Sequence, residues 1–232
     1  MKTFKSLFVA AMSFATITVS AQTADEIVNK HVTALGGADK LASLKTVKME
    51  GTMNTQGIDV ALTLTKKHMA GMRMDMEIMG TSNYQIATPT QGWVFMPVMQ
   101  QTEPQPMDEE QIKSVQSQMD IQGALFNYKE KGFTIESLGT EKVDGKDAYK
   151  LKVVKNGKDV FYFIDAASNF IIKTTSKISA QGQEMDVETT FADYKQNADG
   201  YWFSYTNTTT QGTITFDKIS SNLPVDDKLF TN

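Results

Sequence analysis

The sequence predicts a mainly β protein of the α+β class, built on an antiparallel sheet of about eleven strands. Three observations support this prediction. From Lys45 onward apolar and polar residues alternate, as in strands with one buried and one solvated face. Dipeptides such as Asp144-Gly145 and Asn156-Gly157 favour the tight turns of hairpins. Helical spacing is confined to the first part of the chain and to one central insert.

The first residues have the pattern of a secretion signal. Lys2 and Lys5 precede an apolar run over residues 7–19, which ends in the small-residue site Val19-Ser20-Ala21. The run is shorter than the roughly 20 apolar residues that a membrane-spanning helix needs. We therefore expect residues 1–21 to be a signal peptide cleaved after Ala21. Because no cysteine follows that site, we expect an exported chain without a lipid anchor or transmembrane segment.

Helical and strand signals then follow in order along the mature chain. Thr23 and Glu26 form a capping box that begins a helix ending before Gly36-Gly37, and a short second helix follows over residues 38–44. Alternation predicts strands around residues 47–52, 58–65, 72–78, 84–87 and 93–96. A proline-rich loop over 97–107 leads to a helix over 108–121, begun by a capping box of Asp108 and Gln111, and to a helical piece over 123–128. About six further strands complete one domain over residues 22–232, with its helical insert at about 107–129.

The composition excludes several kinds of chemistry. The absence of cysteine removes thiol nucleophiles, disulfides and thiolate metal sites, and a net charge of −4 gives no basis for nucleic-acid binding. The two histidines, His31 and His68, have no ligand or nucleophile at a recognisable spacing, so we assign them structural roles. Carboxylate pairs such as Asp75 and Glu77 are typical of a solvated strand face. We expect no metal, no cofactor and no enzymatic activity.

Methionine is the residue in excess. Half of the fourteen lie in one stretch of predicted sheet, namely Met69, Met72, Met74, Met76, Met79, Met96 and Met99. Flexible, polarizable methionines are over-used on surfaces that adapt to different guests, although an ordinary sheet core could also contain them. The insert helix offers only a narrow stripe of Ile112, Val115 and Met119, which suits a lightly packed lid over a cavity.

Four segments together resemble the LolA/LolB-like superfamily of outer-membrane lipoprotein-sorting proteins. They are residues 36–41 leading into 47–53, residues 92–97, residues 143–149 leading into 160–165, and residues 222–230. The resemblance covers nearly the whole mature chain through loose patterns. It implies an incomplete antiparallel β-barrel whose concave apolar face is covered by helices, forming a cavity for acyl chains in a periplasmic carrier.

The resemblance also implies a set of site residues. The cavity lining is expected to comprise Val60, Leu62, Leu64, Met72, Met74, Met76, Trp93 and Phe95, and the lid to comprise Ile112, Val115, Met119, Leu125 and Phe126. In well-studied members an arginine near the end of an early strand holds the lid shut. The nearest equivalent is the Lys66-Lys67 pair, with Lys67 as the candidate latch, whereas Arg73 falls on the polar side of its strand.

These expectations define three functional hypotheses. The first is a monomeric periplasmic carrier that holds the acyl chains of lipoproteins or another amphiphilic lipid. It would receive this cargo from a membrane-associated donor protein and deliver it to an acceptor at the outer membrane. The second is a protein-binding or chaperone-like module of the same fold with a filled core. The third is a secreted hydrolase that uses two carboxylates.

Overall fold

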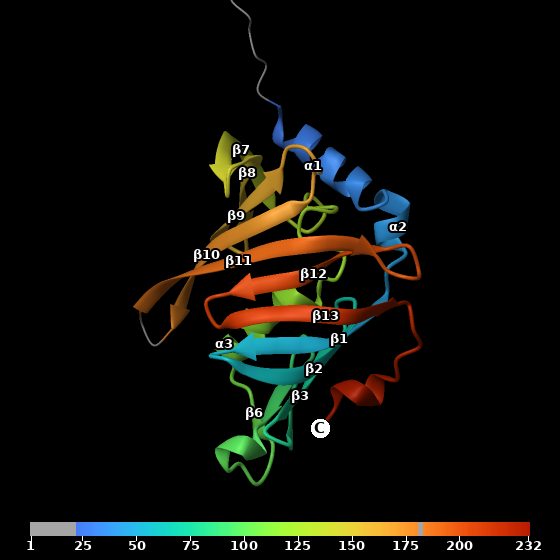
Figure 1. Ribbon diagram of the computed structural model, residues 1–232, viewed down its shortest axis with the longest axis vertical. Helices are drawn as coiled ribbons and strands as arrows, with labels where there is room; N and C mark the ends of the chain where they lie inside the picture. The colour runs from blue at the N-terminus through green and yellow to red at the C-terminus, as the bar shows by residue number, and fades with distance from the viewer. Residues whose placement is uncertain (1–21, 181–182) are drawn as a thin grey trace, which may run out of the picture.

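The computed structural model describes residues 22–180 and 183–232, so the predicted signal peptide over 1–21 lies outside the described residues. All strands of the described part form one antiparallel sheet in the order β6-β5-β4-β3-β2-β1-β13-β12-β11-β10-β9-β8-β7 (Figure 1). Their bounds are β1 Thr46–Thr55, β2 Ile58–Lys67, β3 Gly71–Ile78, β4 Thr81–Ala87, β5 Gly92–Phe95, β6 Gln105–Pro106, β7 Thr134–Val143, β8 Lys146–Lys155, β9 Lys158–Asp165, β10 Ile171–Ala180, β11 Gln183–Gln196, β12 Trp202–Thr209 and β13 Gly212–Ser221. Two meanders therefore join where β1 pairs with β13, and the sheet stays open between β6 and β7. The predicted fold class is confirmed.

The sheet has thirteen strands in the described residues, two more than predicted. One addition is β6, which lies in the predicted proline-rich loop and pairs Gln105 with Val94 of β5. A strand of two residues beside prolines shows no alternation, so only its pairing with β5 identifies it. The loop also contains a short 3₁₀ helix, η1 (Pro97–Met99).

Two helices precede the sheet, and the first of them packs against β8 and β9. The predicted capping box of Thr23 and Glu26 is confirmed at the start of α1 (Ala24–Ala34), which is followed by α2 (Ala38–Ala42). Ile27 of α1 packs against Leu151 of β8 in one buried cluster. His31 is 4% exposed, donates from Nδ1 to the Asn169 carbonyl oxygen over 2.8 Å, and has a pKa lowered by burial. This histidine has the structural role assigned to it.

The insert (residues 107–129) begins with α3 (Glu109–Gln116), whose capping box of Asp108 and Gln111 is also confirmed. A 3₁₀ turn, η2 (Ser117–Met119), follows directly. The helical piece predicted over 123–128 is wrong, because these residues form turns. Gly123 and Asn127 adopt φ values of 87° and 50°, a left-handed conformation that interrupts a helix.

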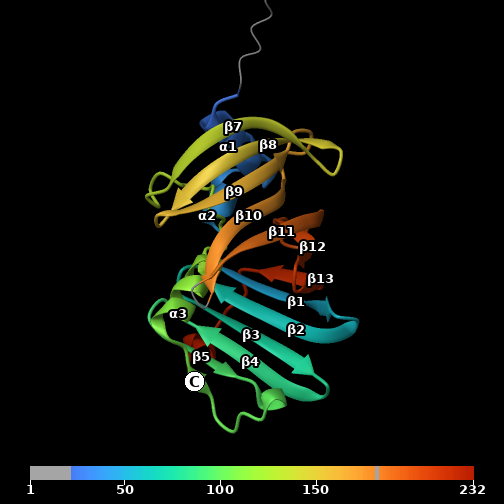
Figure 2. The ribbon, with the colours of Figure 1, turned by 90° about the vertical axis from the view of Figure 1, so that its left-hand side faces the viewer.

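The sheet is curved, and its two edge strands, β6 and β7, lie at opposite ends of the molecule. In Figure 2, β7–β10 lie at one end, β1–β5 at the other, and α3 lies beside the latter group. We call the face that packs against α1 and the insert the inner face, and the opposite one the outer face. In the described residues, no helix is long and apolar enough to span a membrane.

Candidate functional site

Six of the predicted lining residues lie together on the inner face. The register pairs Leu62 with Met76 and Leu64 with Met74, and directly paired residues of antiparallel strands share a face. The same alternation places Val60 and Met72 with them. Val60, Leu62 and Met72 are 2%, 5% and 1% exposed, whereas Leu64, Met74 and Met76 are partly exposed. The inner face of β2 and β3 is therefore apolar and partly open.

Trp93 and Phe95 lie on the outer face, which differs from the prediction. Trp93 pairs with Ile86 and Phe95 with Tyr84, and these β4 residues in turn pair with Arg73 and Asp75. The Tyr84 and Phe95 rings contact each other with centroids 5.4 Å apart, and the Arg73 guanidinium lies 4.7 Å from the Tyr84 ring. Val94 takes the inner position of β5 instead.

The apolar inner face extends beyond the predicted stretch into β1, β12 and β13. Phe216 and Ile219 of β13 are buried there in one cluster with Leu62. The side chains that pack against this cluster and stay partly exposed are Met49, Met53, Leu64, Met76, Ile121, Phe203, Tyr205 and Ile214. Met49 and Met53 face inward because they pair with Leu64 and Val60. The lining thus combines methionines with aromatic side chains from several strands.

The insert contacts the two ends of the sheet through separate apolar groups. Val115 and Met119 pack against Met72 of β3 and Ala87 of β4. Leu125 joins the cluster of α1, β8 and β9, where it is 1% exposed. The other predicted lid residues, Ile112 and Phe126, are also buried. The insert therefore runs across the interior from β3 and β4 to β8 and β9.

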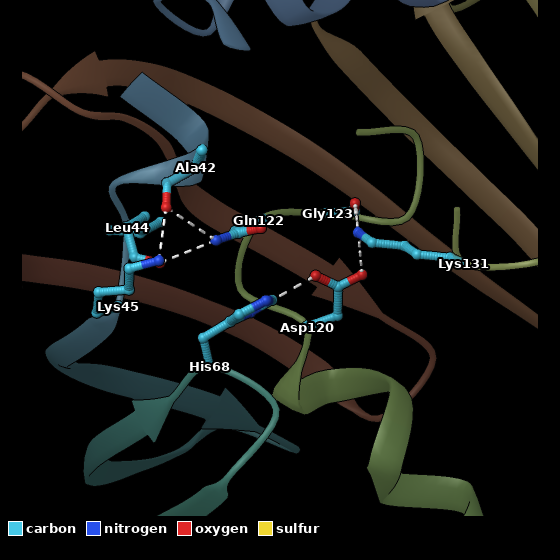
Figure 3. Close-up of polar contacts among 8 residues, drawn as sticks. All are labelled: Ala42, Leu44, Lys45, His68, Asp120, Gln122, Gly123 and Lys131. Atoms are coloured by element: carbon cyan, nitrogen blue, oxygen red, sulfur yellow. Dashed lines mark hydrogen bonds and ion pairs between the residues drawn. The ribbon is translucent and has the colours of Figure 1, made fainter. Parts of the chain in front are cut away.

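Polar contacts of the insert converge on Asp120 (Figure 3). Its carboxylate binds the Lys131 ammonium at 2.7 Å, in the turn before β7, and lies 3.8 Å from Nδ1 of His68, just after β2. The Asp120 side chain is only 8% exposed. Within the described part of the chain, Asp120 Oδ1 and His68 Nδ1 are buried without a hydrogen-bond partner. Burial lowers the pKa of the His68 imidazole, although the nearby Asp120 carboxylate opposes this.

Two backbone-directed contacts add to this attachment. The side-chain amide nitrogen Nε2 of Gln122 donates to the Leu44 carbonyl oxygen over 3.2 Å. The backbone N–H of Met69 donates to the Met119 carbonyl oxygen over 3.0 Å. Both connect the insert to segments that flank β1 and β2. The insert is thus held by a few specific polar contacts in addition to its apolar stripe. No motif or spacing in the sequence marks Asp120 or Gln122 as an attachment residue.

Lys67 does not contact the insert, which corrects its prediction as the latch. Its ammonium binds Asp227 at 2.6 Å, in the C-terminal 3₁₀ helix η3 (Asp227–Phe230). This helix covers the outer face of β3, where a Cβ on Gly71 would meet the Phe230 ring at 2.6 Å. Alternation explains the difference, because Lys66, and not Lys67, shares the face of Leu62 and Leu64.

The open antiparallel sheet, its apolar inner face and the insert across it together form the LolA-like fold. No protein-family model and no curated protein matches the sequence. A LolA superfamily protein of Nitrosomonas europaea has a similar structure, with a TM-score of 0.56, 15% identity, and coverage of 91% of this chain and 99% of that one.

Two further solved structures have the same fold. A domain of Vibrio parahaemolyticus named for outer membrane lipoprotein sorting aligns with a TM-score of 0.53 and 16% identity over 89% of this chain and 95% of that one. A DUF1329 family protein of Desulfovibrio piger aligns with a TM-score of 0.59 and 12% identity over 89% and 96% of the two chains. Identities this low establish the shared fold and no more.

Proposed function

We propose that this protein is a periplasmic carrier that holds the acyl chains of lipoproteins or of another amphiphilic lipid for delivery to the outer membrane. The observation that carries the proposal is the partly exposed apolar surface of Leu64, Met74 and Met76 on the inner face of β2 and β3. Partly exposed apolar side chains on an inner face leave surface that an acyl chain can cover. The names of the structural neighbours agree with this role.

Energetics restrict how such a carrier works. Burial of a methylene is worth roughly 0.8 kcal/mol, so a chain of about fourteen gives on the order of 11 kcal/mol. A bilayer offers the same chain nearly the same free energy. The carrier therefore shields the chain from water and gives it up to a receiver that binds more strongly. Methionine side chains, which repack around guests of different shape, suit repeated loading and release.

In the proposed carrier, the segment that moves is the insert. It covers the inner face through Val115 and Met119, and its polar attachment depends on Asp120 and Gln122. Opening at this end would separate Val115 and Met119 from Met72 and Ala87 and break the contacts of Asp120 and Gln122, and it need not unpair any strand. We therefore propose that the insert acts as a lid, with Asp120 at its main attachment point.

Replacement of Met74 by aspartate is expected to weaken uptake of a fluorescent acyl-chain probe at least about tenfold. A carboxylate on the inner face must be desolvated when the chain covers it, which costs a few kcal/mol. Titration of the purified protein with the probe measures the effect, and the wild type should bind close to one equivalent. The matched control is Met79→Asp, because Met79 is 84% exposed in the turn after β3.

Two results would contradict the carrier proposal. One is a wild-type protein that takes up no probe after delipidation. The other is equal loss of binding in Met74→Asp and Met79→Asp, which would indicate an effect of charge and not of the inner face. Native mass spectrometry after gentle purification provides an independent comparison, because a protein-binding module with a filled core should retain no lipid.

A further inference from the structure

A lysine lies among the apolar side chains of the inner face. Lys66, near the end of β2, pairs with Val47 of β1 and with Met72 of β3, which are 3% and 1% exposed. It follows Val60, Leu62 and Leu64 in the alternation of the same strand. The Lys66 side chain is itself only partly exposed. Its side chain therefore extends from the inner face beside Met72, which the insert covers.

Lys66 has no anionic partner among the hydrogen bonds and ion pairs of the described residues. The contrast with its neighbour is direct, because Lys67 binds Asp227 at 2.6 Å on the outer face. Other cations are also paired, such as Arg73 with Asp75 and Lys131 with Asp120. The inner positions of β1–β4 carry no carboxylate that could neutralise Lys66. Burial alone lowers its pKa to about 8, which still leaves the amine mostly protonated at neutral pH.

A partly buried ammonium without a counter-charge, packed beside apolar side chains, destabilises the folded chain, and a bound anion would reduce that cost. We propose that Lys66 binds the anionic head group of the carried lipid, a carboxylate or a phosphate, while the lipid's chain lies along the methionines of β3. This inference rests on the proposed carrier function and specifies its cargo. Met72, directly beside Lys66, begins the row that continues through Met74 and Met76. One ligand with a charged head and an apolar tail matches this arrangement.

The inference favours one of the two cargoes in the carrier proposal. The acylated N-terminus of a lipoprotein holds its chains through ester and amide groups, which carry no negative charge. Such a group would leave Lys66 unpaired after loading. A fatty acid or an anionic phospholipid would instead place its charge against the ammonium, where low solvent exposure strengthens the interaction. The place of Lys66 beside the methionines of β3 thus favours an anionic lipid.

Paired probes test the head group separately from the chain. A fluorescent long-chain fatty acid is compared with its methyl ester, and fluorescent phosphatidylglycerol with a diacylglycerol of the same chains. We expect the wild type to bind at least one charged probe about tenfold or more tightly than its neutral counterpart. Lys66→Met should abolish this preference while still binding the neutral probe, and Lys66→Arg should retain it. Lys67→Met, one residue away on the outer face, is the matched control and should behave as the wild type.

Each result has one interpretation. Preference for the fatty acid alone or for phosphatidylglycerol alone supports the site and names the head group. Equal binding of charged and neutral probes by the wild type overturns the anion site but leaves the carrier proposal standing. Persistence of the preference in Lys66→Met also overturns it, because another cation would then bind the head group. Failure of all four probes to bind overturns the carrier proposal itself.

Discussion

Replacement of Asp120 by alanine is expected to lower the free energy that holds the insert closed by about 2–3 kcal/mol. The Asp120 carboxylate is 8% exposed and binds Lys131 at 2.7 Å, so its removal leaves a mostly buried ammonium without its counter-charge. Lys131 is 21% exposed, and solvent there reduces the loss below that of a fully buried pair. Amide exchange in α3 and at Met69 should accelerate roughly 30- to 150-fold, since about 1.4 kcal/mol corresponds to a factor of ten.

The insert itself supplies the control for this experiment. Glu109 binds Lys113 at 3.3 Å, but the two side chains are 91% and 71% exposed. Glu109→Ala should therefore change exchange by less than about 0.5 kcal/mol. Amides of β8 and β9 report whether a variant is destabilised as a whole. If exchange in Asp120→Ala equals that in Glu109→Ala, apolar packing alone holds the insert and Asp120 is not its attachment point.

The alternation of the sequence was sufficient to place the inner face of β2 and β3. In both strands apolar residues recur at every second position, so the face of the sheet on which Leu62 or Met74 lies follows from the pattern alone. The same alternation places Lys66 on the inner face and Lys67 on the outer face. The resemblance to an arginine latch had instead suggested Lys67 as the residue that contacts the insert. Each capping box joins two residues three positions apart in the sequence, and both were predicted correctly.

Other features depended on contacts that no local pattern contains. Trp93, Val94 and Phe95 are three consecutive apolar residues, so their alternation does not indicate a face, and pairing with β4 decides it. Asp120 gains its role from His68, which follows β2, and from Lys131, which precedes β7, and these two strands are far apart in the sheet. A single carboxylate in a helical insert gives no sign of such partners. The polar attachment of the insert was therefore accessible only from the structure.

Replacement of Lys66 by methionine is expected to stabilise the lipid-free protein near pH 7, which is unusual for loss of a charged residue. Because burial lowers the pKa of Lys66 from its ordinary 10.5 to about 8, the folded chain binds this proton less strongly than the unfolded chain. The free-energy cost of burying the charged amine is fully present below pH 8. It disappears as the pH rises to about 10.5, above which Lys66 is neutral in both the folded and the unfolded chain. A shift of this size corresponds to roughly 3 kcal/mol, and partial exposure of the side chain reduces it to about 1–2 kcal/mol.

Denaturant unfolding of wild type and Lys66→Met between pH 7 and pH 10.5 measures this difference. The advantage of Lys66→Met should be largest at pH 7 and should shrink steadily above pH 8. Lys67→Met should show no such trend, because Lys67 is paired with Asp227 on the outer face. A difference between wild type and Lys66→Met that stays constant over this range would mean that the ammonium is solvated and bears no burial cost. A lysine that destabilises the empty protein and binds the charge of its ligand would couple stability to loading, so that an anionic lipid stabilises the wild type more than Lys66→Met.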